Sequence, residues 1–326
     1  MGFCAYWRYR FGAGWLGVLV RAKGKQLQHS EFRVGRRAVL AALLAAPVAA
    51  CAPSAQSTAP APVAGPDPAL VELERRYDAR LGLFARNTAT GRTLAHRADE
   101  RVAMCSTFKV YASAALLRAH GLAGGYFERV LRYDAGQLVE NSPITETRVG
   151  VGMTIGELCA AALQHSDNTA ANLLLRELGG PRGITDFARA IGDPVTRLDR
   201  WEVELNTAVP GDERDTSTPR ALADGLQELL LGEALGAPER ERLTGWMLGN
   251  TTGATRIRAG VPRDWRTADK TGGGSAYGVA NDIAVTWTGT GTPIVLSLLT
   301  GRPGEHDEAD SALLADAARL VATRLV

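Results

Sequence analysis

Lysine is scarce in this 326-residue sequence, although basic residues as a whole are not. Of its 37 lysine and arginine residues only four are lysine: Lys23, Lys25, Lys109 and Lys270. Arginine stays protonated in proteins, whereas a lysine can lose its proton when it is desolvated or lies beside another cation. Residues 52–326 hold 27 arginines and just two lysines. In residues 52–326, a reaction that needs an amine able to lose its proton would therefore have to use Lys109 or Lys270.

Other absences exclude whole classes of protein. A hydrophobic content of 45% and a charged content of 22% exclude a disordered or collagen-like chain. The apolar run at 38–50 is shorter than the about 20 residues that a membrane-spanning helix needs, and a polytopic membrane protein is excluded. A formal net charge of +2 gives no reason to expect nucleic acid as a partner. The five histidines and four cysteines lack the spacing of a zinc site, so we expect no zinc site.

The charge is unevenly distributed along the chain. Residues 1–51 carry 8 basic residues and 1 acidic residue, which leaves 29 basic and 34 acidic residues, or −5, in the remainder. The apolar run follows Arg36-Arg37 and ends at Val48-Ala49-Ala50-Cys51. This pattern predicts an export signal, and the paired arginines resemble the twin-arginine type. The small residues before Cys51 resemble a lipoprotein processing box, so a lipid on Cys51 would be the only membrane attachment; a simply cleaved signal of the general route is the alternative.

The segments on either side of this signal are interpreted separately. Residues 1–33 precede an already complete signal, and no methionine lies between Met1 and Met104. We therefore expect translation to start near Val34 from a non-Met codon, and residues 1–33 not to be translated. Residues 52–66 are rich in alanine and proline without apolar periodicity, which predicts a disordered tether. The folded part is expected over 67–326.

The periodicity of 67–326 predicts strands at both ends and helices between them. Alternating patterns predict five strands, at 80–86, 93–98, 267–271, 277–288 and 293–300. Helical spacing predicts helices at 68–77, 107–120, 155–165, 168–178, 181–191, 219–231, 238–248 and 306–325. We therefore expect an α+β fold, in which one five-stranded antiparallel sheet, built from both chain ends with flanking helices, contains an inserted all-helical region. The α/β part would cover about 67–104 and 250–326 and the helical part about 105–249.

The first chemical motif is Ser106-Thr107-Phe108-Lys109. Residues three apart share a helix face, so the spacing places the Ser106 hydroxyl near the Lys109 amine. A lysine that gives up its proton can activate a hydroxyl, and a helix start offers free N–H groups to a developing anion. A capped helix with one surface lysine would show the same four residues.

Two further motifs have ordinary structural explanations when they are taken singly. Ser166-Asp167-Asn168 lies between two predicted helices and is also a good helix N-cap. Lys270-Thr271-Gly272, followed by Gly273 and Gly274, could be a bulged edge strand. It could equally be a bare strand edge against which a substrate lies, flanked by an ammonium group and a hydroxyl.

Together and in this order, the three motifs resemble those of a class A serine β-lactamase, within the superfamily that includes the penicillin-binding proteins. The resemblance covers essentially all of 67–326 and implies an active site at the interface of the α/β and helical parts. The separations of 60 residues from Ser106 to Ser166, 36 to Glu202 and 68 to Lys270 agree with the usual register of the family. The resemblance implies hydrolysis of small-molecule β-lactams through a serine acyl-enzyme, without metal or cofactor. We expect a monomer.

A fourth segment separates the branches of this superfamily. The polar, irregular stretch 199–219 looks like the omega-shaped loop of the family and is called the Ω loop below. In the family's register, Glu202 and Asn206 would hold the water that releases the acyl-enzyme, and the register selects Glu202 over the nearby Glu204. Arg200 and Asp215 look like the ion pair that closes the loop.

The resemblance also assigns the remaining roles. Ser106 would attack the lactam carbonyl, and either Lys109 or Glu202 acting through water would accept its proton. The backbone N–H groups of Ser106 and Gly273 would bind the oxyanion. Ser166 would protonate the leaving nitrogen. The substrate contacts would come from Asn141, Asn168, Lys270, Thr271 and Arg256.

Three positions depart from the family pattern. Asn141 stands before Ser142-Pro143, where many relatives have an aromatic residue. Val279-Ala280 stands where many relatives have an arginine on the strand after the Lys-Thr-Gly strand, and Arg256 is expected to supply that charge to the substrate carboxylate. Cys105 is disulfide-bonded in some relatives, but the pairing position here is Gly274, so we expect a free thiol.

Two alternative functions share parts of this pattern. A D,D-peptidase or penicillin-binding enzyme has the first three motifs but lacks efficient deacylation, and the pair Glu202 and Asn206 argues against it. A non-catalytic lipoprotein could bind β-lactams or cell-wall peptides, and the complete set of motifs argues against that function.

Overall fold

The computed structural model describes residues 8–11, 14–17 and 67–326. Strands β1 (Arg8–Phe11) and β2 (Gly14–Gly17) form an antiparallel pair. The predictions for the export signal, for Cys51 and for the tether lie outside the described residues, and the expected start near Val34 is likewise untested. No helix in the described part of the chain is both long and apolar enough to cross a membrane.

A five-stranded antiparallel sheet forms the centre of residues 67–326. Its strands come from both ends of that region, as the sequence predicts, and lie in the order β4-β3-β11-β10-β9. The strands are β3 (Arg80–Asn87), β4 (Thr93–His96), β9 (Arg266–Gly273), β10 (Ala280–Trp287) and β11 (Pro293–Gly301). β9, which carries the Lys-Thr-Gly motif, is an edge strand.

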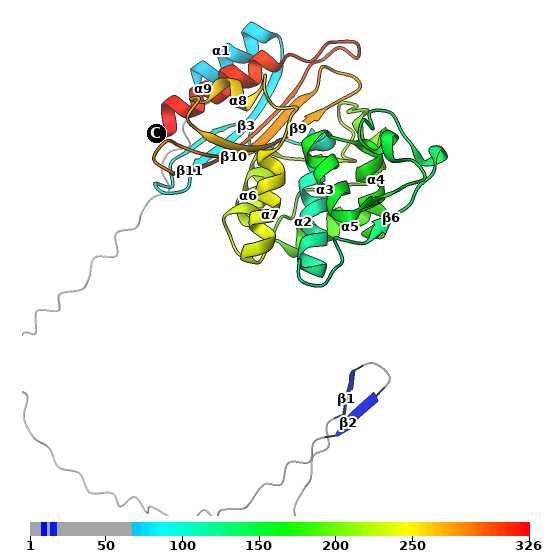
Figure 1. Cartoon of the computed structure of the whole chain (residues 1–326). Helices are drawn as coiled ribbons and strands as arrows, with labels where there is room; N and C mark the ends of the chain where they lie inside the picture. The colour runs from blue at the N-terminus through cyan, green and yellow to red at the C-terminus, as the bar shows by residue number, and fades with distance from the viewer. Residues whose placement is uncertain (1–7, 12–13, 18–66) are drawn as a thin grey trace, which may run out of the picture. The chain divides into compact units, whose positions relative to one another are not determined.

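Helices cover both faces of this sheet (Figure 1). The helices α1 (Pro68–Tyr77), α8 (Ile257–Gly260) and α9 (Ser311–Leu325) lie on one face. Apolar side chains alternate along the strands, because successive residues point to opposite faces. Leu296 and Leu298 of β11 pack with α1 and α9, whereas Val295 and Leu299 pack with the helices of the other face.

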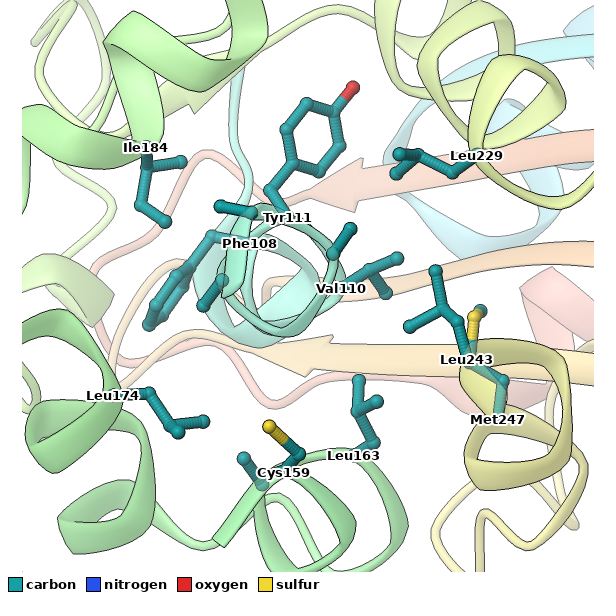
Figure 2. Close-up of a cluster of buried hydrophobic side chains, with 14 of the residues drawn as sticks. Phe108, Val110, Tyr111, Cys159, Leu163, Leu174, Ile184, Leu229, Leu243 and Met247 are labelled. Atoms are coloured by element: carbon teal, nitrogen blue, oxygen red, sulfur yellow. The ribbon is translucent and has the colours of Figure 1, made fainter. Parts of the chain in front are cut away.

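The other face carries the inserted helical region. Its helices are α2 (Lys109–His120), α3 (Ile155–Gln164), α4 (Asn168–Glu177), α5 (Arg182–Ala190), α6 (Pro219–Leu230) and α7 (Ala237–Leu248). α2 is central, and its first nine residues are all buried. Figure 2 shows Val110 and Tyr111 of α2 among side chains of the surrounding helices, including Leu163, Leu174 and Leu243. Because α2 is packed on all sides, it provides a rigid support for the segment that precedes it.

Short elements connect these layers near the start of α2. The 3-10 turn η1 (Cys105–Phe108) directly precedes α2, and η2 (Ala135–Gln137), η3 (Thr145–Arg148) and η4 (Glu204–Asn206) lie in loops. β5 (Val102–Ala103) pairs with β8 (Thr216–Ser217), and β6 (Val130–Leu131) pairs with β7 (Met153–Thr154). The β5–β8 pair ties the segment before Ser106 to the end of the Ω loop.

Three elements begin two or more residues later than predicted, and the strands predicted at 93–98 and 267–271 end at His96 and Gly273. The helix expected from residue 107 becomes an α-helix only at Lys109, because 105–108 form a tighter 3-10 turn. The strand expected from Tyr277 begins at Ala280, because positive φ angles of 55° at Tyr277 and 54° at Gly278 interrupt extended structure. The last helix starts at Ser311 rather than at residue 306. The Asp310 side chain caps this start by accepting a hydrogen bond from the Ala312 N–H.

Two glycines provide a test of the packing of α8 against α9. A Cβ at buried Gly260 would lie 2.0 Å from the Ala315 carbonyl oxygen, whereas a Cβ at exposed Gly245 in α7 would meet nothing within 4 Å. We expect Gly260→Ala to lower the free energy of unfolding by about 1–3 kcal/mol through overpacking. Gly245→Ala should raise it by about 0.5–1 kcal/mol through helix propensity. Chemical denaturation measures both, and equal effects would contradict this packing.

Candidate active site

The position of Ser106 follows from the turn that carries it. Cys105 has a φ of 46°, which turns the chain sharply between β5 and η1. Thr107 fixes the turn by donating its hydroxyl to the Met104 carbonyl at 2.8 Å. β9 can approach this turn only because Gly272 lacks a side chain, since a Cβ there would lie 2.8 Å from the Met104 oxygen. Ser106 is therefore set beside the exposed end of β9, and it keeps 8% of its surface exposed.

Lys109, the first residue of α2, has no solvent-exposed surface. Its Nζ lies 2.8 Å from the Ser166 carbonyl oxygen, 2.7 Å from Asn168 Oδ1 and 3.0 Å from Glu202 Oε1. The side chains of Ser106 and Lys109, which the sequence places near each other, are linked through Glu202. Ser106 Oγ donates to the same Glu202 Oε1 at 3.3 Å, so hydroxyl and amine meet at one carboxylate oxygen.

Ser166 lies between the two lysines of the folded region. Its φ of 56° places its backbone in the left-handed region, which is uncommon for a residue other than glycine. Lys270 Nζ donates to Ser166 Oγ at 3.1 Å, and Lys109 Nζ lies 3.4 Å from the same oxygen. Because both amines act as donors, the hydroxyl proton of Ser166 is free for a third acceptor.

Burial dominates the electrostatics of both amines. Desolvation lowers the pKa of Lys109, and the charge of Glu202 opposes that shift. The pKa of Lys270 lies well below its ordinary value, through desolvation and then through the charge of Lys109. Two neighbouring cations without solvent disfavour each other's protonated form. Each lysine can therefore release a proton more readily than an exposed lysine could.

Glu202 is held by its backbone as well as by its carboxylate. The side-chain amide of Asn172 accepts from the Glu202 N–H at 3.0 Å and donates to the Glu202 carbonyl at 2.9 Å. Asn206 Nδ2 donates to Glu202 Oε2 at 2.5 Å. Sequence reasoning missed Asn172. Its signal was present, because it follows Asn168 by one turn of α4 and so projects from the same face.

The predicted ion pair of the Ω loop is present. Arg200 Nε lies 2.5 Å from Asp215 Oδ2, and the Asp215 side chain has no exposed surface. Asp215 Oδ1 also accepts from the N–H groups of Asp199 and Arg200 at 2.7 and 2.9 Å. A second contact joins the loop to the segment after β9, where the Ser275 N–H donates to the Asn206 carbonyl at 2.8 Å. The Ω loop is thus fastened at both sides of the site.

Asp167 is a second residue that sequence reasoning assigned only to capping. Its buried carboxylate accepts four hydrogen bonds of 2.8 to 2.9 Å: from the N–H of Ile144, from the N–H and hydroxyl of Thr145, and from the N–H of Ala170. It therefore caps α4 and also anchors the loop that contains Asn141. Because Ser166 is the preceding residue, these hydrogen bonds also fix the position of Ser166.

The predicted substrate-contacting residues lie around this centre. Asn141 has a φ of 57° and directs Nδ2 to the Ser166 carbonyl at 3.4 Å, and its own carbonyl accepts from the Asn168 N–H at 3.0 Å. Asn168 Nδ2 donates to the Glu140 carbonyl at 2.8 Å. Its amide therefore links Lys109 to the loop of Asn141.

The other predicted substrate-contacting residues lie on or beside the end of β9. Thr271 Oγ1 lies 2.5 Å from Thr252 Oγ1, and Gly273 is exposed at the strand end. Arg256 donates to the carbonyls of Gly272 and Asn281 at 2.7 and 2.6 Å. Its hydrogen bonds within residues 67–326 go to carbonyls and one hydroxyl, so no carboxylate there takes up its charge by hydrogen bonding.

Both cysteines of the folded region are free, as predicted for Cys105. Both are fully buried. Burial raises the pKa of the Cys159 thiol to about 12 and that of Cys105 further. Thiols of this kind are poor nucleophiles. In the part of the chain that was described, no three histidine, cysteine or acidic residues are grouped as a metal site would require.

The fold brings a serine, two buried lysines and a carboxylate together, which is the set of groups that a serine hydrolase needs. A model of the beta-lactamase enzyme family matches residues 67–325. β-Lactamase AST-1 of Nocardia asteroides is 53% identical over 304 residues, which cover 89% of this chain and 97% of that protein. The carbapenem-hydrolyzing β-lactamase KPC of Klebsiella oxytoca is 48% identical over 285 residues, covering 87% and 95%.

Solved structures agree with this relationship. The β-lactamase of Streptomyces albus G superimposes with a TM-score of 0.78 at 47% identity, covering 79% of this chain and 98% of that one. A β-lactamase from Desulfarculus baarsii gives 0.76 at 53% identity, covering 78% and 94%. The chain belongs to the β-lactamase family, as a class A serine enzyme whose activity is β-lactam hydrolysis. The D,D-peptidase and the non-catalytic lipoprotein are set aside.

The Ω-loop ion pair can be tested against a matched surface pair. Arg200→Gln would leave the Asp215 carboxylate buried without its partner, so hydrogen exchange of the amides between them should accelerate more than about tenfold. Arg197→Gln removes a pair whose partner Asp199 keeps 27% exposure. Because surface pairs contribute only about 0–1 kcal/mol, that change should be under about threefold. Equal acceleration in the two variants would show that Asp215 does not hold the loop.

Proposed function

We propose that Ser106 performs the β-lactam hydrolysis of this class A enzyme by forming an ester with the opened lactam. The observation that carries this assignment is the shared oxygen: Ser106 Oγ and Lys109 Nζ both contact Glu202 Oε1, at 3.3 and 3.0 Å. A nucleophile, an amine that burial disposes to lose its proton and a carboxylate are thereby in direct contact, as covalent catalysis requires.

In the acylation step, Ser106 Oγ forms a bond to the lactam carbonyl carbon and loses its proton to the pair of Lys109 and Glu202. The pair acts as one base, because its two members share the oxygen that the serine contacts. The carbonyl oxygen becomes an oxyanion between the N–H groups of Ser106 and Gly273. A donor of this kind is typically worth about 3–4 kcal/mol of barrier.

Cleavage of the lactam C–N bond then needs a proton on the leaving nitrogen. Ser166 is proposed to supply it. Its oxygen accepts from Lys270 and Lys109 at 3.1 and 3.4 Å, which leaves its own proton for the nitrogen. The lysines replace that proton, so the proton that left Ser106 returns through the same network.

Deacylation is assigned to Glu202. Its carboxylate, fixed by Asn172 and Asn206, would take a proton from water as the water oxygen attacks the ester carbonyl. The ester C–O bond then breaks and Ser106 regains its proton. A penicillin-binding enzyme that lacks this carboxylate would remain acylated.

Substrate recognition is proposed for the polar residues around this centre. Lys270, Thr271 and Arg256 at β9 present positive charge and a hydroxyl to the carboxylate that β-lactams carry. Asn168 and Asn141 on the opposite side present amides to the substrate side chain. Without an aromatic residue at position 141, that wall offers hydrogen bonding rather than stacking.

The location of the enzyme is a proposal from the first 66 residues. Export, by the twin-arginine route or the general one, would bring residues 67–326 to the periplasm or to the outer face of the membrane. A lipid on Cys51 would retain them there at the end of the tether 52–66. The catalytic domain 67–326 is proposed to work as a monomer with the α/β and helical parts given above, and to confer resistance by removing β-lactams.

A chromogenic cephalosporin tests the division of roles. The parent protein should turn it over rapidly. Ser106→Ala should form no adduct in intact-protein mass spectrometry, because the nucleophile is missing. Glu202→Ala should accumulate a covalent adduct, because its slowest step becomes deacylation, with turnover reduced by at least about 100-fold. A stable adduct on the parent protein, or none on Glu202→Ala, would contradict the assignment.

The same assay separates binding from chemistry for Arg256. Arg256→Gln removes a charge-assisted contact worth about 1.5–3 kcal/mol, so the KM should rise at least about tenfold. Arg132→Gln, an exposed arginine that donates only to the backbone carbonyls of residues 150 and 151, is the matched control. An unchanged KM in Arg256→Gln would refute its role.

A further inference from the structure

A second cavity lies behind the Ω loop, away from Ser106. It encloses about 760 Å³ and is formed by α1, the segment before β5, the Ω loop and the end of β11. Cavities of about 300–1,000 Å³ are typical of sites for small molecules. None of the residues assigned to catalysis above lines it, although Arg200 of the loop-closing ion pair does.

The wall of this cavity is rich in arginine, although the domain as a whole is acidic. Seven arginines and three acidic residues line the cavity, which gives +4 (7 − 3). Residues 67–326 as a whole carry −5, since 52–66 contain no charged residue. Carboxylates pair with six of these seven arginines, so an anion in the cavity would be held by the remaining arginine rather than by the charge of the whole wall.

One of these arginines is available to a ligand. Six of the seven pair with a carboxylate within residues 67–326, among them Arg97 with Glu74 and Arg214 with Asp212. Arg101 pairs with none in that part of the chain and uses one guanidinium nitrogen, which donates to the Val195 carbonyl at 3.2 Å and to Thr216 Oγ1 at 3.0 Å. Its remaining N–H donors can hold a carboxylate or sulfonate.

The same cavity also exposes apolar side chains. Val71 of α1 and Val209 of the Ω loop keep 42% and 47% of their surface exposed, and they are two of the six large apolar side chains classed as exposed in residues 67–326. Exposed apolar surface gathered beside a free cation is complementary to a molecule with one charged end and an apolar body.

Two of the segments that line the cavity also contribute to the active site. Residues 208–212 lie between Asn206 and Asp215 in the Ω loop, and Tyr277 lies in the segment that follows Gly273. The Ser275 N–H holds these two segments together at the Asn206 carbonyl. A molecule in the cavity therefore contacts the loop that carries Glu202 from behind.

We propose that this cavity binds an amphiphilic monoanion, a carboxylate or sulfonate with an apolar body, with its charge at Arg101 and its body against Val71 and Val209. Binding braces residues 208–212 against α1. These residues belong to the loop that carries Glu202. The consequence of bracing for deacylation rests on the role assigned to Glu202 above, whereas the binding itself does not.

Fluorescence titration of the full-length Ser106→Ala protein with 8-anilinonaphthalene-1-sulfonate tests the site. We expect saturable binding at one site per chain, weakened about tenfold or more by Arg101→Gln and unaffected by Arg132→Gln. Val209→Asp should weaken it as well. The uncharged analogue N-phenyl-1-naphthylamine should bind less tightly and should be insensitive to Arg101→Gln. Hydrogen exchange in 208–212 should slow in the presence of the sulfonate.

Ampicillin identifies which site the probe occupies. In Ser106→Ala it cannot acylate the protein, and its saturating presence should leave the binding of the sulfonate unchanged. Displacement by ampicillin, equal affinities in Arg101→Gln and Arg132→Gln, or a lack of saturable binding would each overturn the proposal. Because fluorescence needs no turnover, these results are independent of whether the catalytic roles are correct.

Discussion

The structure depends on the burial of two lysine amines around one serine and one glutamate. Lys109 and Lys270 have no exposed surface, and burying a charge without compensation is prohibitively costly. Glu202, Ser166 and the carbonyls near them provide the compensation. The helical region, the sheet edge and the Ω loop must therefore all close on the same point, because each supplies a member of this network.

That requirement explains how the fold is built around the site. α2 is surrounded by apolar side chains, so the turn at its start cannot move (Figure 2). The sheet brings β9 against that turn, and Gly272 permits the close approach. The Ω loop has only the short elements η4 and β8, and the buried Asp215 and the amide of Asn172 hold the rest of it. Rigid elements thus carry Ser106, and a fastened loop carries Glu202.

Much of this arrangement could be predicted from sequence. Period-two and helical patterns located the five strands and the helical insertion, and the scarcity of lysine singled out Lys109 and Lys270 before any comparison. The shared oxygen of Glu202 could not be predicted, because it depends on the tertiary placement of the Ω loop. Asp167 illustrates the same limit: a helix cap is local and readable, but its bonds to the loop at Thr145 are not. The cavity at Arg101 is likewise formed by segments far apart in sequence.

The central claim is that the base of acylation needs an amine able to lose its proton. Lys109→Arg keeps a positive charge but not that ability. Rapid-quench mass spectrometry of Lys109→Arg, with Lys109→Met as a second variant and circular dichroism to establish folding, measures the acylation rate directly. The account predicts that acylation slows by at least about 100-fold in both folded variants. Acylation of Lys109→Arg within about threefold of the parent rate would contradict it.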